Sequence, residues 1–249
     1  MPLVNVSIQK QEQAGASSTR THPLSGAIAN NWFFSDQFNR TTLNPSDVLA
    51  LYATTVAGTG TIVIAGANSL QIQTGTTINS NTQIRLSEMA FQRQALGLEN
   101  RGTVIYESTF QNNATVAGVE MFVGLVIQSS ANLTALPTSA ARHLGIQLDA
   151  SVSGNFFWTT ANGTDEVNTD TGILANTARR RLRISWTGDD SAIMEVFDGT
   201  LLDNLVDSIT VTDIDMSDTR VFTPVWFMEN EAAANKDLRI QWWAVSWLP

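Results

Sequence analysis

Leu182-Arg183-Ile184-Ser185-Trp186 alternates apolar and polar side chains without interruption. Successive side chains of a β-strand point to opposite faces of the sheet, so this pattern places the three apolar side chains on one buried face. Residues 187–191 contain a glycine and two aspartates, which are typical of a turn, and residues 192–198 return to a strand pattern. The sequence therefore predicts two antiparallel strands joined by a short turn.

Working outward from this segment, short strand signals recur at intervals of roughly ten residues, with Gly, Asn and Asp between them. The other predicted strands are residues 61–64, 70–73, 104–110, 120–127, 143–149, 155–160, 208–212, 221–228 and 238–247. Segment 120–127 is apolar on both faces, as expected of a central strand that is covered on each side. Helical periodicity is confined to residues 87–98 and 138–142. The sequence predicts an all-β protein, a two-sheet antiparallel jelly-roll sandwich over residues 32–249.

Residues 1–31 differ from the rest of the chain because they are mostly small and polar. Such a segment buries too little apolar surface to offset the entropy of ordering it, so we expect an extended N-terminal arm that something else must hold. The candidate anchoring residues are Leu3, Val4, Val6 and Ile8. Sequence alone leaves open whether this arm binds its own domain or a neighbouring chain.

Composition excludes several classes of protein. The chain has no cysteine, which excludes disulfides and thiolate metal sites. Its net charge of −9 argues against binding to nucleic acid, because no excess of Lys and Arg is available to neutralise phosphates. There is no apolar run long enough to span a membrane, and we expect no signal peptide because the N-terminus lacks a basic start followed by an apolar stretch.

Residues 34–46 contain an acidic residue, Phe, Asn and a Thr-Thr-Leu element in that order. Together with residues 68–72, 181–199 and 238–245, they resemble concanavalin A-like lectin/glucanase domains, which are laminin-G-like jelly rolls. In chain order, the four segments resemble the opening, a second strand pair, a later hairpin and the closing strand of these domains. The resemblance implies two antiparallel sheets, one of them concave, with function on the concave face or in the loops at its rim. In these domains a Trp often follows the opening Leu. This sequence departs from that pattern, because it has Val48 or Leu49 at the corresponding position.

Catalytic and metal-binding patterns are weak. The glucanases among the domains that this sequence resembles carry a Glu-x-Asp-x-Glu strand, which would place paired carboxylates on one face. No such strand is found; Glu229 and Glu231 have alternate spacing but are interpreted as a solvated pair at the end of a strand. Calcium is conceivable at Asp189-Asp190 or within residues 165–170, but neither forms an ordered ligand series. The sequence therefore predicts no enzyme and no cofactor.

Aromatic residues give the best candidates for ligand binding. Trp and Phe rings can stack on the apolar faces of sugars while amides and carboxylates bind the hydroxyls. The candidate glycan contacts are Phe157, Trp158 and Asn162, because two adjacent rings precede a polar segment. Trp186, Trp226 and Trp243 fall in apolar strand patterns and are expected in the core.

Two functional hypotheses remain. The first is a non-enzymatic structural virion protein, such as a phage capsid decoration or a head or tail appendage, assembled in the host cytoplasm. The Ser/Thr/Asn-rich composition of the chain suits such a protein. The partners would be other virion subunits or further copies of this chain, held through the arm. The alternative is a lectin-like module that binds surface glycans. Neither hypothesis involves nucleic acid or a membrane.

Overall fold

The computed structural model describes residues 33–38, 52–65, 69–86, 103–112, 117–186, 191–213 and 221–248. The predicted arm, with Leu3, Val4, Val6 and Ile8, lies outside these ranges. So do the predicted helix at 87–98 and the candidate calcium ligands Asp189 and Asp190.

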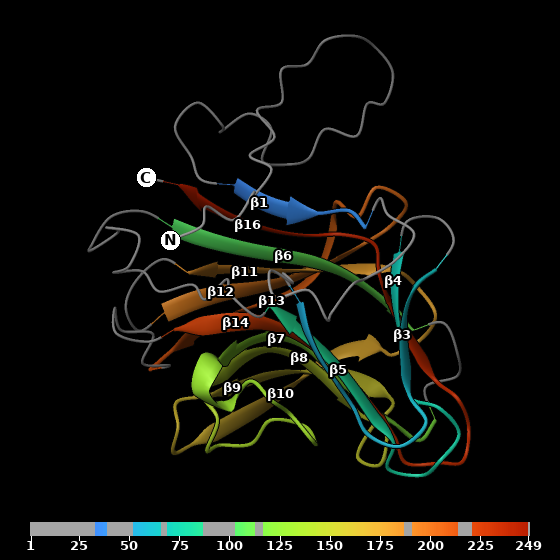
Figure 1. Ribbon diagram of the computed structural model, residues 1–249. Coiled ribbons are helices and arrows are strands. Elements are labelled where there is room, and N and C mark those ends of the chain that lie inside the picture. The colour runs from blue at the N-terminus through green and yellow to red at the C-terminus, as the bar shows by residue number, and fades with distance from the viewer. Residues whose placement is uncertain are drawn as a thin grey trace, which may run out of the picture.

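The described residues form two β-sheets (Figure 1), and all strand pairings are antiparallel. The nine-stranded sheet has the order β13 (Asn204–Thr212), β12 (Ser191–Asp198), β11 (Arg180–Trp186), β6 (Thr103–Asn112), β15 (Asp237–Ile240), β4 (Ser69–Gln73) and β3 (Thr61–Ala65), with β16 (Trp243–Leu248) pairing β6 and β1 (Phe33–Asp36) pairing β16. The seven-stranded sheet has the order β10 (Glu166–Leu174), β9 (Asn155–Ala161), β8 (His143–Asp149), β7 (Val119–Ile127), β14 (Phe222–Asn230), β5 (Asn81–Leu86) and β2 (Tyr52–Val56). The predicted two-sheet antiparallel sandwich is confirmed.

The hairpin predicted from residues 181–198 is formed by β11 and β12. Leu182 pairs with Val196, Ile184 with Met194, and Trp186 with Ala192. All six side chains are buried, because each lies on the strand face that is turned toward the other sheet.

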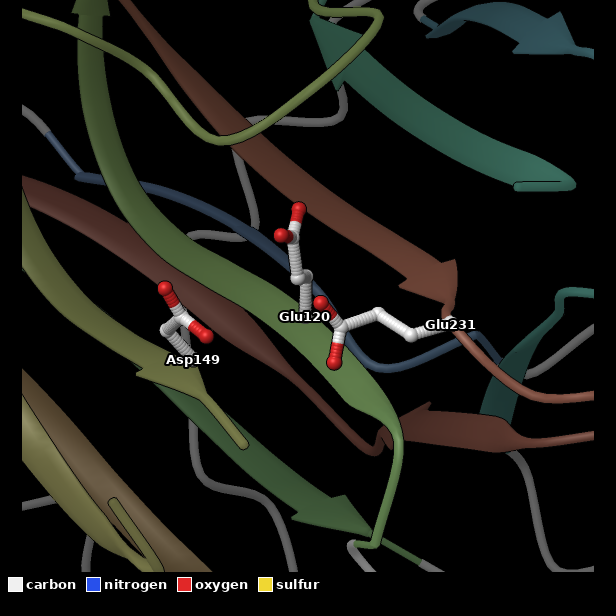
Figure 2. Close-up of side chains that lie close together, drawn as sticks. All are labelled: Glu120, Asp149 and Glu231. Carbon is white, nitrogen blue, oxygen red and sulfur yellow. The ribbon is translucent and has the colours of Figure 1, made fainter. Parts of the chain in front are cut away.

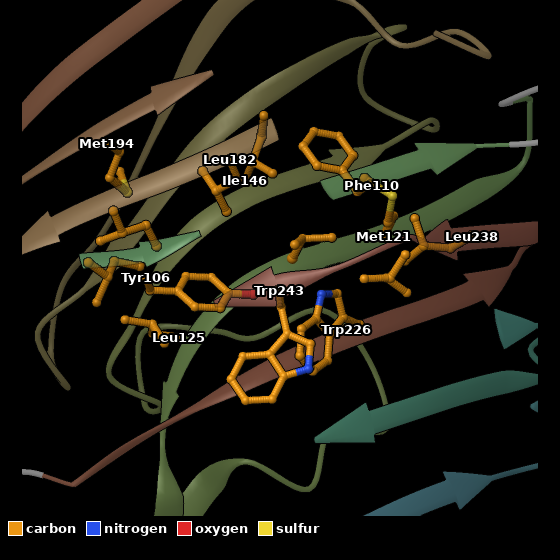
Figure 3. Packing of buried hydrophobic residues seen from close by; sticks show 14 of the residues in the cluster. Tyr106, Phe110, Met121, Leu125, Ile146, Leu182, Met194, Trp226, Leu238 and Trp243 are labelled. Carbon is orange, nitrogen blue, oxygen red and sulfur yellow. The ribbon is translucent and has the colours of Figure 1, made fainter. Parts of the chain in front are cut away.

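The core lies between the two sheets (Figure 3). Trp226 of the seven-stranded sheet packs against Trp243 of the nine-stranded sheet, with ring centroids 6.3 Å apart. Each indole nitrogen donates a hydrogen bond, Trp226 to the Ser108 hydroxyl at 2.9 Å and Trp243 to the Tyr52 hydroxyl at 2.7 Å. The expectation that Trp186, Trp226 and Trp243 belong to the core is confirmed, and the polar atoms of Trp226 and Trp243 are satisfied where they are buried.

The two arginines at the start of β11 are both buried, although they lie on opposite faces of the strand. Arg180 has the parity of Leu182 and is buried, with its guanidinium 5.4 Å from the Phe156 ring centroid. Arg181, on the opposite face, is also buried and lies 3.4 Å from the Glu107 carboxylate and 4.0 Å from the Phe197 ring centroid. Both guanidinium groups therefore serve internal contacts.

Helical structure is scarce, as expected. Among the described residues the helical element is the short 3-10 turn η3 (Gln128–Ser130), and residues 138–142 form a turn rather than a helix. No helix of the described part of the chain has the length and apolar character needed to cross a membrane.

Candidate functional site

The face of the seven-stranded sheet that is turned away from the core, called the outer face here, has two different halves. On β7 the side chains of Met121, Val123 and Leu125 point into the core. The alternate residues Glu120, Phe122, Gly124 and Val126 therefore belong to the outer face. Apolar residues of this outer face form a second buried cluster over β7 and β14, while polar residues gather over β8, β9 and β10.

The segment 128–142, called the strap here, covers the first half. Its Ala131 and Leu133 pack into the second cluster with Phe122, Val225 and Phe227. The predicted covering of the central strand on both sides is thereby confirmed, since the strap buries the outer side of β7 and the core buries the inner side.

Polar anchors hold the strap to the sheet. Gln83 of β5 is completely buried; its amide nitrogen donates to the Ala131 carbonyl at 2.6 Å and its amide oxygen accepts from the Leu133 N–H at 2.5 Å. The Asn81 amide donates to the Thr134 carbonyl at 3.0 Å. Buried backbone groups need hydrogen-bond partners. These side chains give the strap backbone the hydrogen bonds that water would otherwise make.

His143 fixes the end of the strap where the chain enters β8. Its Nδ1 lies 2.6 Å from the Ala141 carbonyl oxygen, its Nε2 lies 2.8 Å from the Thr159 hydroxyl, and the ring packs edge-on to Phe122. Burial lowers the pKa of His143, so the neutral ring is favoured. His143 is therefore a buried sheet residue whose two ring nitrogens both have hydrogen-bond partners.

The second half of the outer face is polar and partly open to solvent, since Asn168 and Asp170 are exposed whereas Gln147 is buried. Phe157 of β9 is half-buried and stands directly between Gln147 of β8 and Asp170 of β10. The Gln147 amide donates to Asn168 Oδ1 at 3.2 Å, and the Asn155 amide donates to the Asp170 carboxylate at 3.1 Å. The ring is thus surrounded by a fixed set of amides and carboxylates.

Carboxylates gather where the two halves meet. Glu120 stands opposite Asp149 of β8 and Glu229 of β14, and Glu231 follows β14. Each of Glu120, Asp149 and Glu231 has an oxygen within 4.8 Å of an oxygen of the other two, and Figure 2 shows these three side chains together. We call Glu120, Asp149, Glu229 and Glu231 the carboxylate cluster.

Burial and the negative charges of Glu229, Asp149 and Glu231 together raise the pKa of Glu120 to about 7, although a hydrogen bond from the Leu136 backbone lowers it. Burial and the charge of Glu231 also raise the pKa of Glu229. Glu120 is therefore able to hold a proton near neutral pH. Oxygen ligands of this kind suit hard cations such as Ca²⁺ as well as proton transfer.

The predicted glycan contacts are separated by the structure. Phe157 lies on the open half of the outer face, but Trp158, its neighbour, points into the core and is 2% exposed. The Trp158 indole donates to the Asp207 carboxylate of β13 at 2.7 Å. Asn162 lies in the β9–β10 turn, where its side-chain oxygen accepts from the N–H groups of Thr164 and Asp165. Of the three, Phe157 is the one with a ring on the open face.

Sequence reasoning missed the carboxylate cluster. Glu229 and Glu231 were interpreted as a solvated pair, whereas Glu229 is half-buried at the end of β14 beside Glu120. A partial signal was present in the alternation: Glu120 begins the predicted strand 120–127, Glu229 directly follows the predicted strand 221–228, and both have the parity of the outer face. What the sequence did not contain was the pairing of β7 with both β8 and β14.

Comparison with known proteins identifies the fold. No protein-family model matches the chain, and no curated protein matches it. Solved structures with similar folds include peanut lectin, with 12% identity, a TM-score of 0.58 and coverage of 88% of this chain and 98% of the lectin. A glycoside hydrolase family protein from Mycobacterium thermorestibile has 13% identity, a TM-score of 0.59 and coverage of 85% of this chain and 99% of that one. A pseudo-β-1,3-glucanase of Mycobacterium tuberculosis has 12% identity, a TM-score of 0.59 and coverage of 85% and 97%.

These similarities confirm the lectin- and glucanase-like jelly roll that the sequence resemblance implied. They also correct one prediction. The sequence was interpreted as that of a protein that is not an enzyme. This exclusion of enzymes is wrong, because proteins named as glycoside hydrolase and β-1,3-glucanase have the same fold. The physical reason for the error is that carboxylates were sought on one strand, whereas here they converge from several. At such low identity the likeness shows the fold alone.

Proposed function

We propose that the chain binds carbohydrate on the open half of the outer face of its seven-stranded sheet. One observation carries the proposal: the half-buried ring of Phe157 lies among outward-facing amides and carboxylates of β8, β9 and β10. The ring offers an apolar surface for the C–H face of a sugar. Amides and carboxylates beside it offer acceptors and donors for hydroxyl groups.

The hydrogen bonds on this surface support the proposal. Gln147 donates to Asn168 and Asn155 donates to Asp170, so the side chains of these two pairs are held in place before any ligand arrives. Such preorganisation reduces the entropy cost of binding. The names of the similar structures make β-1,3-glucan the first carbohydrate to try.

A glycan array with the full chain tests this function. We expect Phe157→Ala to lower the signal about fivefold or more, because a stacked ring contributes on the order of 1 kcal/mol or more. Val63→Ala is the matched control: Val63 is an exposed apolar residue of β3, in the other sheet, and its loss should leave the signal unchanged. An array on which the wild-type chain binds no glycan would refute the proposal.

Hydrolysis of a glycosidic bond is a second candidate, favoured by the raised pKa of Glu120 within the carboxylate cluster. Retaining glycosidases use one protonated carboxyl and one carboxylate close together. In that reaction Glu120 would give its proton to the leaving oxygen while Asp149, opposite it on β8, attacks the sugar carbon. Water then releases the sugar and returns the proton.

A structural role in a virion remains a prediction based on composition. It depends on the arm at residues 1–31, which lies outside the described residues, and on partners that would be other virion subunits or copies of this chain. Carbohydrate binding is compatible with that setting, because a particle can recognise surface glycans through such a domain.

A further inference from the structure

The strap defines one boundary of the proposed carbohydrate site. It leaves β7 at Ile127, reaches β5 and β2 through Ala131, Asn132 and Leu133, and returns to β8 at His143. At its outer limit the Thr55 hydroxyl of β2 donates to Asn132 Oδ1 at 2.7 Å. The strap thus lies over the β2, β5, β14 and β7 side of the outer face.

The strap is a packed element rather than a loose cover. Phe122, Val126, Val225 and Phe227 of the sheet are all at most 1% exposed beneath it. Opening the strap would expose these four apolar side chains to water, which opposes opening. A ligand that binds the native protein therefore meets the strap in its closed position.

The carboxylate cluster lies against the edge of the strap. The Leu136 backbone of the strap hydrogen-bonds Glu120, so this carboxyl is at the point where the covered half begins. Phe157, Asp149 and Glu120 lie on β9, β8 and β7, three successive strands. A glycan that stacks on Phe157 and reaches Glu120 must cross these strands and then meets the strap.

The remaining open width is small. The three strands outside the strap, β8, β9 and β10, lie at about 4.8 Å spacing and give a surface roughly 10–15 Å across, which accommodates only a few sugar rings. A polysaccharide crossing the whole sheet would need the four strands that the strap covers.

From this arrangement we infer that the site takes the end of a glycan chain and excludes internal segments of a polysaccharide. The inference rests on the proposed carbohydrate-binding function and specifies its ligand: a chain terminus whose last ring lies beside Glu120 and the strap. If the site also hydrolyses, the same geometry makes it release sugars from chain ends.

The test uses the full chain with linear β-1,3-glucans of short and long defined length, and measures the number of protein molecules bound per glucan by titration calorimetry. We expect one protein per chain at every length. Coupling a bulky group to one particular end of the short glucan should weaken binding at least about tenfold, while the same group on the other end has little effect.

Two results would overturn the inference in different ways. If the number of bound proteins grows with glucan length and neither blocked end matters, internal segments bind; carbohydrate binding then stands and end recognition falls. If neither glucan binds and the glycan array is also empty, the proposed function falls and the inference falls with it. Phe157→Ala run in parallel assigns any binding to the open half of the outer face.

Discussion

Burial of Glu120 beside three other carboxylates has consequences for stability as well as for chemistry. Its pKa is raised to about 7 by burial and then by the charges of Glu229, Asp149 and Glu231. In the unfolded chain the carboxyl returns to its ordinary value near 4.5. The folded protein thus binds a proton that the unfolded chain has already lost between these pH values, and its stability falls as pH rises through this window.

Glu120→Gln should remove that dependence. Above pH 7 we expect the variant to be more stable than the wild type by about 1–2 kcal/mol, a figure reduced for the partial exposure of the group. Below pH 4.5 the two proteins should differ little, since Glu120 is protonated in both states. Urea unfolding at pH 4.5 and pH 8 measures the difference, with Asp165→Asn, in the exposed β9–β10 turn, as control. A difference that is the same at both pH values would contradict this account.

The hydrolytic candidate makes a separate prediction at the same residue. If wild-type protein releases sugar from β-1,3-glucan, Glu120→Gln should lower kcat by about 10²–10⁴-fold while leaving glucan affinity within a few-fold, because general acid catalysis is lost and the ring platform remains. The wild-type rate should decrease as pH rises above about 7, where Glu120 loses its proton. Reducing-sugar release across pH 4–9 measures both. Undiminished activity in the variant would remove Glu120 from the reaction.

At the scale of elements, the strap depends on a few buried polar contacts. Gln83 supplies both a donor and an acceptor to the strap backbone, at Ala131 and Leu133. Thr55 makes a comparable hydrogen bond to Asn132, but in an exposed position. The cost of losing a hydrogen bond depends mainly on whether the abandoned partner can find water.

Gln83→Ala should therefore lower the free energy of unfolding by about 2–4 kcal/mol, since two buried backbone groups lose their partner. Thr55→Ala, the matched control, should cost less than about 1 kcal/mol because Asn132 is exposed. Urea unfolding gives the free energies, and limited proteolysis should find new cleavage within residues 128–142 in the Gln83 variant alone. Equal effects of the two substitutions would show that burial of Gln83 does not control the strap.

The elements also show what could be predicted from the sequence. The β11–β12 hairpin could be predicted because its signal is local: alternation, a turn and a second alternation within about twenty residues. The pairing of Glu120 with Asp149 and Glu229 could not, since it requires knowing which strands are neighbours. Trp158 failed as a platform residue for a related reason. Its parity within β9 was open until the sheet showed which face is buried, and a shift of one residue exchanges Trp158 for Phe157.

At the scale of the whole molecule, we predict that the arm mediates assembly. Deleting residues 1–31 should convert a defined oligomer into monomers while leaving the melting temperature within about 2 °C, because the described sandwich has its own core. Light scattering on both proteins measures the masses, and calorimetry measures the melting. An unchanged mass would mean that Leu3, Val4, Val6 and Ile8 do not assemble subunits.

The pairing of β1 with β16 has a consequence for how the protein is made. β16 lies between β1 and β6 in the nine-stranded sheet, and its Trp243 donates to Tyr52, which in turn donates to Asp36. Residues 33–36 can therefore join a sheet only after residues 243–248 have been synthesised. During synthesis about 200 further residues must leave the ribosome before this edge can close, so the β1 segment stays without its partner strand while they are made.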